Sequence, residues 1–148
     1  MYLRHLTLNH YRTYARLEIE LEPGVSVFIG ENARGKTNLL EAIYLLAVGR
    51  VARAELDGEA IAWDASDRPP FARVAGDVVV ARGEMRAEAV IAAHQGWEEE
   101  PSPSRPPRAS KRFRINGVPR RLADFAGTFA ATLFSVEDLA VVNGPPSG

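Results

Sequence analysis

The sequence predicts an α/β fold in which β-hairpins accompany one principal helix. Apolar and polar residues alternate in the ranges 2–8 and 15–21, an apolar run at 25–29 ends in a glycine-rich loop, and leucines follow that loop at helical spacing. Alternation with a period of two is typical of half-buried strands, whereas a period near 3.6 is typical of helices. Both kinds of element are therefore expected within one domain.

The composition excludes several classes of protein. The chain has 148 residues, of which 46% are apolar and 25% charged, and its formal net charge is −1. It has no cysteine, which excludes disulfide frameworks, thiolate catalysis and cysteine-based zinc sites. The N-terminal residues MYLRHLTLNHYR do not form the apolar stretch of a signal peptide, and no run approaches the ~18 apolar residues of a membrane span. We expect a cytoplasmic protein with no membrane partner.

The first half of the chain is expected to contain three strands and one helix. The ranges 2–8 and 15–21 predict adjacent strands, and 25–29 predicts a buried strand after the breaker Glu-Pro-Gly. The helix after the glycine-rich loop should end at Gly49, because glycine is the usual helix stop. Residues 50–70 show no clear period and are expected to be irregular or partly helical.

The second half is expected to contain two hairpins around a loop. Ranges 72–82 and 84–94 predict one hairpin, and the dipeptide Asn116-Gly117 predicts another, because a type I′ turn needs positive φ at both central residues. The proline-, serine- and charge-rich range 96–110 has little to bury and predicts a mobile surface loop. Shorter elements are expected after it: a helix at 122–129, a strand at 131–134 and a helical turn at 137–142.

A loop at residues 30–37 carries the strongest chemical signal. The string GENARGKT matches the phosphate-binding pattern G-x-x-x-x-G-K-S/T at every fixed position. Gly30 and Gly35 let the backbone turn so that successive N–H groups point at phosphate oxygens. Lys36 supplies positive charge for the β- and γ-phosphates, and the Thr37 hydroxyl suits a magnesium ion.

The flanking sequence supports this interpretation of the loop. An apolar run before it and an amphipathic helix after it are the context that the motif requires, and the helix would point its unpaired N–H groups at the same anion. Given ordinary glycine usage, a chance match is expected roughly once in a few hundred chains of this length. We therefore expect the chain to bind ATP with magnesium.

Two residues of the early turn could lie beside the nucleotide. The first strands of such a domain run next to the phosphate loop, so Arg12 could reach the nucleotide and Tyr14 could stack near its base. The alternative is an exposed turn with an aromatic ring packed beneath it. The sequence leaves both interpretations open.

Basic residues crowd between Arg105 and Arg121 without an acidic residue among them. Arg112, Arg114 and Arg120 are the candidates for contacts with a DNA backbone. The alternative is a solvated face, since the acidic residues Glu98–Glu100 are close by in the sequence. The three histidines have no metal-ligand spacing, and Glu137-Asp138 is better explained as the turn that starts a helix.

Four segments are characteristic when they are taken together. They are MYLRHLTLNHYRTYARLEIEL, GENARGKTNLLEAIYLLAVGR, INGVPRR and LFSVEDLAVVNGPPS. Together they resemble the N-terminal part of the RecF family of bacterial recombination mediators. The resemblance implies an ABC-type P-loop ATPase lobe with a mixed β-sheet. It also implies binding to DNA at gaps, an ATP-dependent homodimer, and work with other recombination mediator proteins in DNA repair, the SOS response and replication.

The resemblance assigns roles residue by residue. It implies magnesium binding by Thr37, an α-phosphate contact by Arg12 and phosphate binding by the loop. The loop residues are Gly30, Glu31, Asn32, Ala33, Arg34, Gly35 and Lys36. Two positions depart from the family pattern: Arg34 stands where the family usually has glutamine, and Val136 where it usually has proline. Neither is a fixed position of the loop.

Two elements that the family uses for hydrolysis are missing from the sequence. These are an LSGGQ-like signature and an apolar strand ending in Asp-Glu. Residues 1–148 are therefore expected to form a partial N-terminal ATP-binding lobe without the signature and Walker B half, with very slow hydrolysis and no catalytic residue assigned. A small-molecule phosphotransferase and a non-hydrolysing nucleotide-binding module remain the alternatives.

Overall fold

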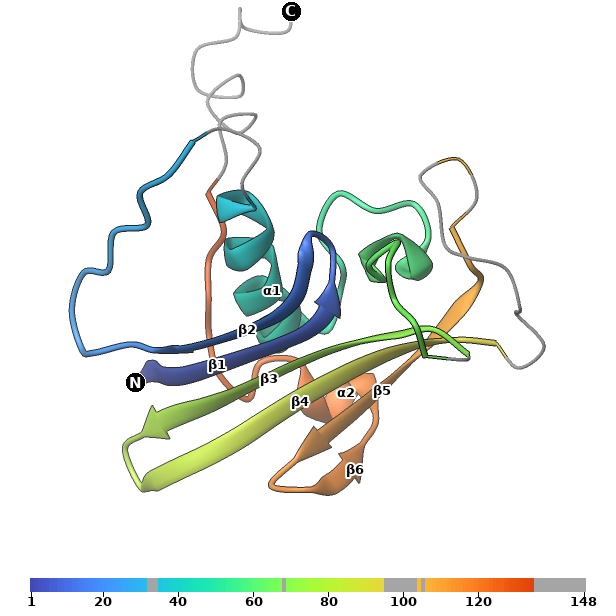
Figure 1. Cartoon of the computed structure of the whole chain (residues 1–148). Coiled ribbons are helices and arrows are strands. Elements are labelled where there is room, and N and C mark those ends of the chain that lie inside the picture. The colour runs from blue at the N-terminus through green and yellow to red at the C-terminus, as the bar shows by residue number, and fades with distance from the viewer. Residues whose placement is uncertain (32–34, 68, 95–103, 105, 135–148) are drawn as a thin grey trace, which may run out of the picture.

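One antiparallel sheet with the strand order β2-β1-β3-β4-β5-β6 organises the molecule (Figure 1). The computed structural model describes residues 1–31, 35–67, 69–94, 104 and 106–134. The strands are β1 (Tyr2–Tyr11), β2 (Tyr14–Glu20), β3 (Phe71–Val80), β4 (Gly83–Ala93), β5 (Ala109–Ile115) and β6 (Val118–Arg120). The helical elements are α1 (Lys36–Val48), the 3-10 turn η1 (Asp57–Ala60) and α2 (Leu122–Phe125).

The first hairpin is confirmed and follows the alternation in the sequence. Leu6 pairs with Ile19 and Leu8 with Leu17, so the apolar residues of β1 and β2 lie on one face. Leu6 and Leu8 are fully buried there. The intervening polar residues face the opposite side, which carries cross-strand ion pairs such as that between His5 and Glu18.

The two later hairpins are also confirmed. Strands β3 and β4 pair along their whole length and turn where Val80 opposes Gly83. Strands β5 and β6 turn at Asn116 and Gly117, whose φ angles of 49° and 79° are the positive values that a type I′ turn needs. Each turn was recognisable because its backbone geometry favours a particular residue type.

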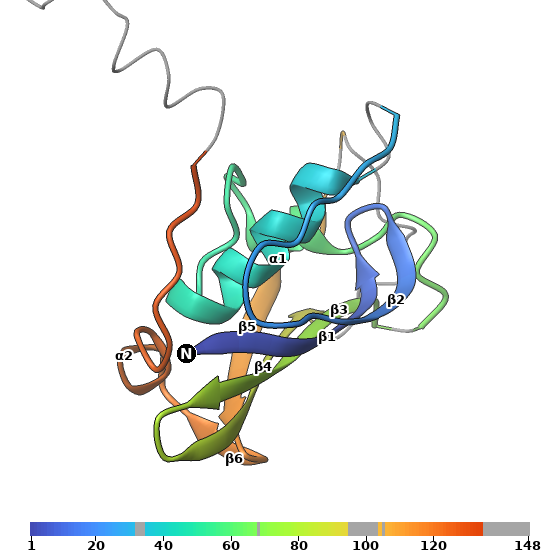
Figure 2. The ribbon, with the colours of Figure 1, turned by 90° about the vertical axis from the view of Figure 1, so that its left-hand side faces the viewer.

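Helix α1 covers the apolar face of the sheet and contacts β1, β3 and β4 (Figure 2). Its buried side includes Leu39, Leu45 and Leu46, which recur at helical spacing. The helix ends as predicted at Gly49, where φ is 70° and the backbone N–H donates to the carbonyl of Leu45 at 2.8 Å. The core between α1 and the sheet therefore fixes where the loop before α1 lies.

Truncating a buried leucine of α1 should destabilise the fold strongly. Leu46 is fully buried, so Leu46→Ala should lower the free energy of unfolding by about 2–5 kcal/mol through lost apolar burial and a residual cavity. Leu40 is 42% exposed on the same helix, and Leu40→Ala should cost well under half as much. Urea denaturation of both variants measures the difference, and equal losses would contradict this placement of α1.

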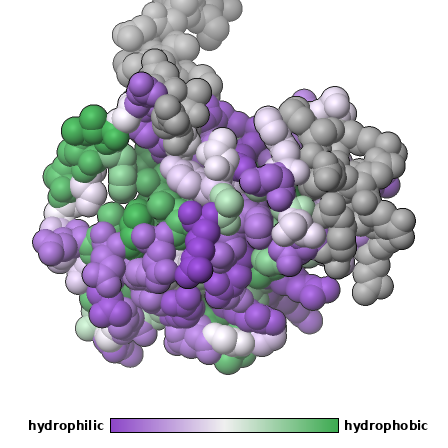
Figure 3. Space-filling view, viewed as in Figure 1, coloured by the Kyte–Doolittle hydropathy of each residue, from purple (hydrophilic) through white to green (hydrophobic). Residues whose placement is uncertain are grey.

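The predicted buried strand at 25–29 is wrong. These residues form no strand, and Val25 and Ile29 are 94% and 92% exposed. The segment arches away from the sheet (Figure 1), and its apolar side chains belong to the green patch of Figure 3. Within the described residues no strand lies beside it, so its backbone has no ladder partner and its side chains have no opposing layer.

Other predictions in less regular segments were partly wrong. The strand expected at 131–134 is irregular, because it pairs with none of the described strands. The helix expected at 122–129 stops at Phe125, and Gly127, with φ of 82°, donates its N–H to Ala47 instead. The prediction that residues 50–70 are irregular or partly helical is confirmed, since among the described residues of this range the four residues of η1 are the helical ones.

Several predicted features fall on residues outside those that the structure describes. They include Glu137-Asp138 with its helical turn, and most of the loop expected at 96–110, although Ala109 and Ser110 belong to β5. Among the described residues, no helix has the length and apolar character that crossing a membrane requires.

Candidate nucleotide-binding site

The β1–β2 turn braces the end of the glycine-rich loop. Gly35 precedes α1 with φ of 88° and is buried against the side chains of Thr13 and Tyr14. A Cβ at this position would lie 2.6 Å from Thr13 Oγ1 and 3.0 Å from the Tyr14 hydroxyl oxygen. The Tyr14 hydroxyl donates to the Gly35 carbonyl at 2.9 Å. Glycine is required here both for its backbone conformation and for the close approach.

Lys36 points back across the loop that precedes it. Its Nζ donates to the carbonyl oxygens of Gly30 and Glu31, each at 2.5 Å. Asn32, Ala33 and Arg34 lie outside the described residues. The ammonium group therefore lies at the N-terminal end of α1, where the helix dipole also favours an anion.

Thr37 is exposed as the second residue of α1, so its hydroxyl is accessible from solvent. Among the described residues, no group of three or more His, Cys, Asp or Glu side chains could hold a metal ion. A single hydroxyl ligand is enough for magnesium when phosphate oxygens and water supply the others. The residues present fit that form of magnesium binding.

A cavity of about 470 Å³ lies beside the N-terminal part of α1. Its lining residues are Arg12, Thr13, Asn38, Glu59, Trp63 and Asp64. Asn38 donates to Thr13 Oγ1 at 3.1 Å, which ties α1 to the β1–β2 turn. Trp63 is 60% exposed at this cavity. The sequence did not reveal Asn38, Trp63 or Asp64 as site residues, because they follow no motif and meet only through packing.

Arg12 and Tyr14, the two residues expected beside the nucleotide, line different cavities. Arg12 lines the cavity, and its Nη2 donates to the Ala52 carbonyl at 2.8 Å and lies 3.4 Å from Glu41 Oε2. Tyr14 instead braces Gly35, and its ring lines a separate, largely apolar cavity of about 390 Å³ that Lys36 also lines. Trp63, rather than Tyr14, is the aromatic residue that shares a cavity with Arg12.

Tyr11 lies fully buried beneath this turn, and its hydroxyl has no hydrogen-bond partner among the residues that the structure describes. Burial raises the pKa of the Tyr11 phenol to about 12, and the nearby Glu41 adds to that rise. The folded state disfavours the phenolate, so the phenol ionises more readily in the unfolded chain. The stability that the protonated Tyr11 side chain contributes is therefore fully present below about pH 10 and is lost as the pH rises toward 12. The loss should reach about 3 kcal/mol, at roughly 1.4 kcal/mol per pKa unit.

Tyr11→Phe should remove this alkaline sensitivity while leaving stability near pH 8 almost unchanged, because the lost hydroxyl makes no hydrogen bond. Urea denaturation of the protein and the variant between pH 8 and pH 11.5 measures the slope. Tyr2→Phe, half-buried on the same strand, is the control for removing a phenol. An equal slope in the protein and Tyr11→Phe would contradict the assignment to Tyr11.

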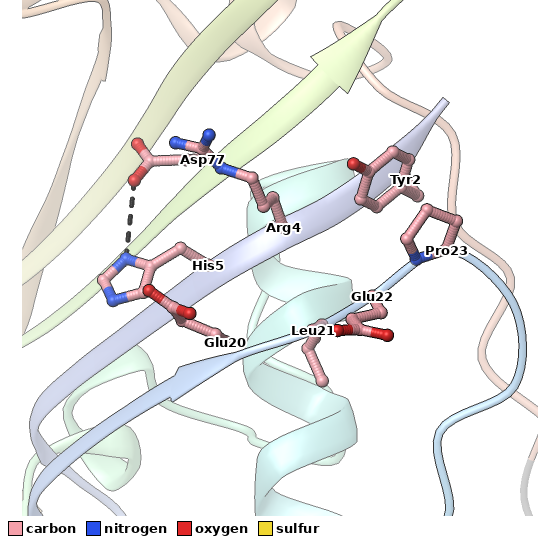
Figure 4. A pocket seen from close by; sticks show the side chains of 8 residues that line it. All are labelled: Tyr2, Arg4, His5, Glu20, Leu21, Glu22, Pro23 and Asp77. Carbon is pink, nitrogen blue, oxygen red and sulfur yellow. Dashed lines mark ion pairs between the residues drawn. The ribbon is translucent and has the colours of Figure 1, made fainter.

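A third cavity, of about 610 Å³ and lined mostly by polar residues, lies where β1 begins and β2 ends (Figure 4). His5 lies within it, 3.4 Å from Asp77 Oδ2 on β3 and 3.2 Å from Glu18 Oε1 on β2. Asp77 also binds Arg86 on β4 at 2.8 Å. These pairs hold His5 and Asp77 within the sheet. No described residue of the glycine-rich loop or of α1 lines this cavity.

The three arginines of the expected DNA patch do not share one face. Arg112 and Arg114 alternate with the core residue Phe113, so both lie on the outer face of β5. Arg114 also binds Glu88 on β4 at 3.1 Å. Arg120 pairs in register with Phe113 and therefore belongs to the opposite face of the sheet edge. Only Arg112 and Arg114 are brought together.

Comparison with known proteins identifies the family. Residues 1–78, more than half of the chain, match the family described as AAA ATPase domain. The chain belongs to this family. It is 40% identical over 150 residues to the DNA replication and repair protein RecF of Chloroflexus aurantiacus, in a match that covers 99% of the chain and 37% of that protein. The chain therefore spans a little over a third of this relative's length.

Solved structures agree with this assignment. One of the recombination mediator protein RecF-ATP in the RecFOR pathway superposes with a TM-score of 0.75 at 27% identity, covering 98% of this chain and 35% of that one. A structure on ATP-driven dimerization and DNA-stimulated activation of SMC ATPases superposes with a TM-score of 0.74 at 17% identity, covering 99% and 93%, and shows the fold alone. The predicted resemblance to RecF and the predicted α/β ATPase lobe are confirmed. The sheet was expected to be mixed, but all of its strand pairs among the described residues are antiparallel.

Proposed function

We propose that this chain is the ATP-binding lobe of a RecF-type DNA repair and replication protein. The observation that carries the proposal is the convergence of Lys36, Gly35 and the N-terminus of α1 on one loop. Lys36 Nζ lies within 2.5 Å of two carbonyl oxygens of that loop, which supplies a cation where the triphosphate would bind. The relatives named RecF and RecF-ATP support the choice of ATP.

The surrounding residues suit the remaining parts of the nucleotide. The Thr37 hydroxyl would contribute one ligand to magnesium, and the guanidinium of Arg12 would contact the α-phosphate from the adjoining cavity. The exposed indole of Trp63 offers a flat apolar surface on which a base can stack. Bound magnesium would neutralise phosphate charge, while these side chains bind and orient the nucleotide.

Calorimetric titration with magnesium and ATP tests the proposal directly. ATP should bind, and adenosine should bind far more weakly, because the loop, Lys36 and the helix N-terminus recognise phosphate rather than the nucleoside. Equal affinities for ATP and adenosine would show that the glycine-rich loop does not bind the triphosphate.

DNA binding and ATP-dependent dimerisation are also part of the proposal. The outer-face pair Arg112 and Arg114 would contact the phosphate backbone, and Arg120, on the opposite face of the sheet edge, would contact it around that edge. The relatives named as DNA replication and repair proteins support DNA as the partner. The site on DNA in this proposal is a gap. The proposal also includes a homodimer that encloses ATP and contacts with other recombination mediator proteins.

Reversing the three arginines should flatten the salt dependence of DNA binding. Each phosphate contact that is lost should lower the slope of log affinity against log salt by about 0.9 for duplex DNA or about 0.7 for single strands. The triple variant Arg112→Glu, Arg114→Glu, Arg120→Glu should therefore lose a slope of one or more. Arg16→Glu, 75% exposed on β2 at the other edge, is the control. Fluorescence anisotropy across a salt series measures the slopes, and an unchanged slope would assign the patch to solvent.

The phosphotransferase alternative has less support. Such enzymes need an acceptor pocket and usually an arginine-bearing lid over the phosphates. Here the segment after α1 leads through η1 directly into the β3–β4 hairpin. Slow or absent hydrolysis would leave a nucleotide-binding module, which is compatible with the same site.

A further inference from the structure

Helix α1 carries a buried acidic side chain in its middle. Glu41 is 2% exposed and is the one buried charged residue of the core among the described residues. A carboxylate is costly to bury unless it is paired and hydrogen-bonded. Its neighbours on the helix, Leu39 and Ala42, fill the same core with apolar atoms, so packing alone does not require a charge at position 41.

Two arginines from separate segments meet this carboxylate. Arg53, from the segment after α1, donates its Nε to Glu41 Oε1 at 2.8 Å and adds a shorter contact through Nη2. Arg12, from the β1–β2 turn, brings Nη2 to 3.4 Å from Glu41 Oε2. Glu41 therefore joins the nucleotide-loop helix, the turn and the segment after the helix at one point.

Both arginines have strained backbones. Their φ angles are 53° for Arg12 and 52° for Arg53, a left-handed conformation that residues with a Cβ rarely adopt. Such conformations persist where surrounding contacts hold them, and they concentrate at ligand sites. The Arg12 backbone N–H donates to the Ala60 carbonyl at 2.8 Å. The buried Nε of the Arg12 side chain has no hydrogen-bond partner in the described part of the chain.

The contacts of Arg12 and Arg53 with Glu41 differ in length, which would allow Arg12 to exchange Glu41 for a phosphate. Arg53 binds Glu41 closely, whereas Arg12 binds it at 3.4 Å and also lines the 470 Å³ cavity. A phosphate entering that cavity could therefore take Arg12 as a partner while Arg53 kept Glu41 paired. The carboxylate would not be left as an isolated buried charge.

We propose that Glu41 is a positioning residue that holds the Arg12 guanidinium at the wall of the cavity, ready for the α-phosphate. Arg53 is the anchor that keeps Glu41 paired when Arg12 turns to the nucleotide. This inference rests on the proposed function. It adds a role for a residue that would not itself touch ATP.

A double-mutant cycle on ATP affinity tests the proposal. Arg12→Gln should weaken magnesium-ATP binding about tenfold. Glu41→Gln should weaken it several-fold, because the Arg12 guanidinium would lose its charged partner and keep only the Ala52 carbonyl as an acceptor among the described residues. If Glu41 acts through Arg12, the double variant should bind about as weakly as Arg12→Gln alone. In a parallel cycle, Glu41→Gln is combined with Lys36→Ala. The fold-losses of ATP affinity from these two variants should multiply, because Glu41 does not act through Lys36.

Glu88 provides a matched control for the loss of a buried carboxylate. It is 12% exposed and also binds two arginines, Arg73 and Arg114, but it lies on the outer face of the sheet. Glu88→Gln should leave ATP affinity unchanged while lowering the melting temperature to a similar degree as Glu41→Gln. Equal losses of ATP affinity in the two variants would indicate a general structural effect and overturn the proposal.

A measurement without nucleotide tests the contact between Glu41 and Arg12 separately from ATP binding. The Nη–H resonances of Arg12 in nitrogen-15 correlation spectra should be resolved and protected from exchange in the protein, because Nη2 faces Glu41 and the Ala52 carbonyl, and they should be broadened in Glu41→Gln. Arg12→Gln identifies those resonances by their loss. If the chain binds ATP but the fold-losses of affinity from Arg12→Gln and Glu41→Gln multiply in the double variant, Glu41 does not act through Arg12, and the positioning role alone is excluded. Failure of the unaltered chain to bind ATP would remove the proposed function and this inference together.

Discussion

Lys36→Ala should weaken binding of magnesium-ATP by about 10- to 100-fold. The ammonium group is the charged donor at the centre of the loop, and hydrogen bonds to charged groups contribute about 1.5–3 kcal/mol each. The variant should keep its fold, because Lys36 Nζ bonds only to loop carbonyls near the surface among the described residues. Calorimetric titration with ATP measures the loss.

The chain contains a second lysine that serves as a control. Lys111 on β5 binds Asp57 at 2.8 Å, away from the loop. Lys111→Ala removes the same side chain without touching the phosphate site, so it should leave ATP affinity unchanged. Equal losses in the two variants, or unchanged binding in Lys36→Ala, would exclude Lys36 from the site.

Gly35→Ala should abolish measurable ATP binding at ordinary concentrations. A methyl group there would lie 2.6 Å from Thr13 Oγ1 and 3.0 Å from the Tyr14 hydroxyl oxygen. Thr13 Oγ1 also accepts a hydrogen bond from the Asn38 side chain. The Thr13 and Tyr14 side chains would have to move, which would disturb the hydrogen bond from the Tyr14 hydroxyl to the Gly35 carbonyl. In addition, a left-handed backbone costs a residue with a Cβ about 1–2 kcal/mol. Titration of the variant with ATP, alongside its melting temperature, measures both effects.

Gly117→Ala separates crowding from backbone strain. Gly117 has a similar φ of 79°, but a Cβ there meets nothing within 4 Å. Its substitution should therefore lower stability by about 1–2 kcal/mol through strain alone and leave ATP affinity unaltered. If Gly35→Ala bound ATP as well as Gly117→Ala, the close packing of Gly35 would have no role in the site.

Local sequence patterns predicted the hairpins and the main helix correctly. Alternation placed β1 and β2, Asn116-Gly117 placed the β5–β6 turn, and leucine spacing placed α1 with its end at Gly49. Each of these signals depends on residues close together in the chain. The prediction of a strand at 25–29 was wrong because a strand also needs a hydrogen-bonded neighbour, and a short stretch of sequence does not show whether one is present.

The candidate site divides in the same way. The sequence by itself determined Gly35, Lys36 and Thr37, because a phosphate loop is built from consecutive residues whose spacing is its geometry. Only the tertiary structure decided that Trp63 shares a cavity with Arg12, and that Arg12 and Arg53 meet Glu41. These residues are far apart in the chain, and they meet only because α1 packs across the sheet and brings the early turn and the later segment to the same end of the helix.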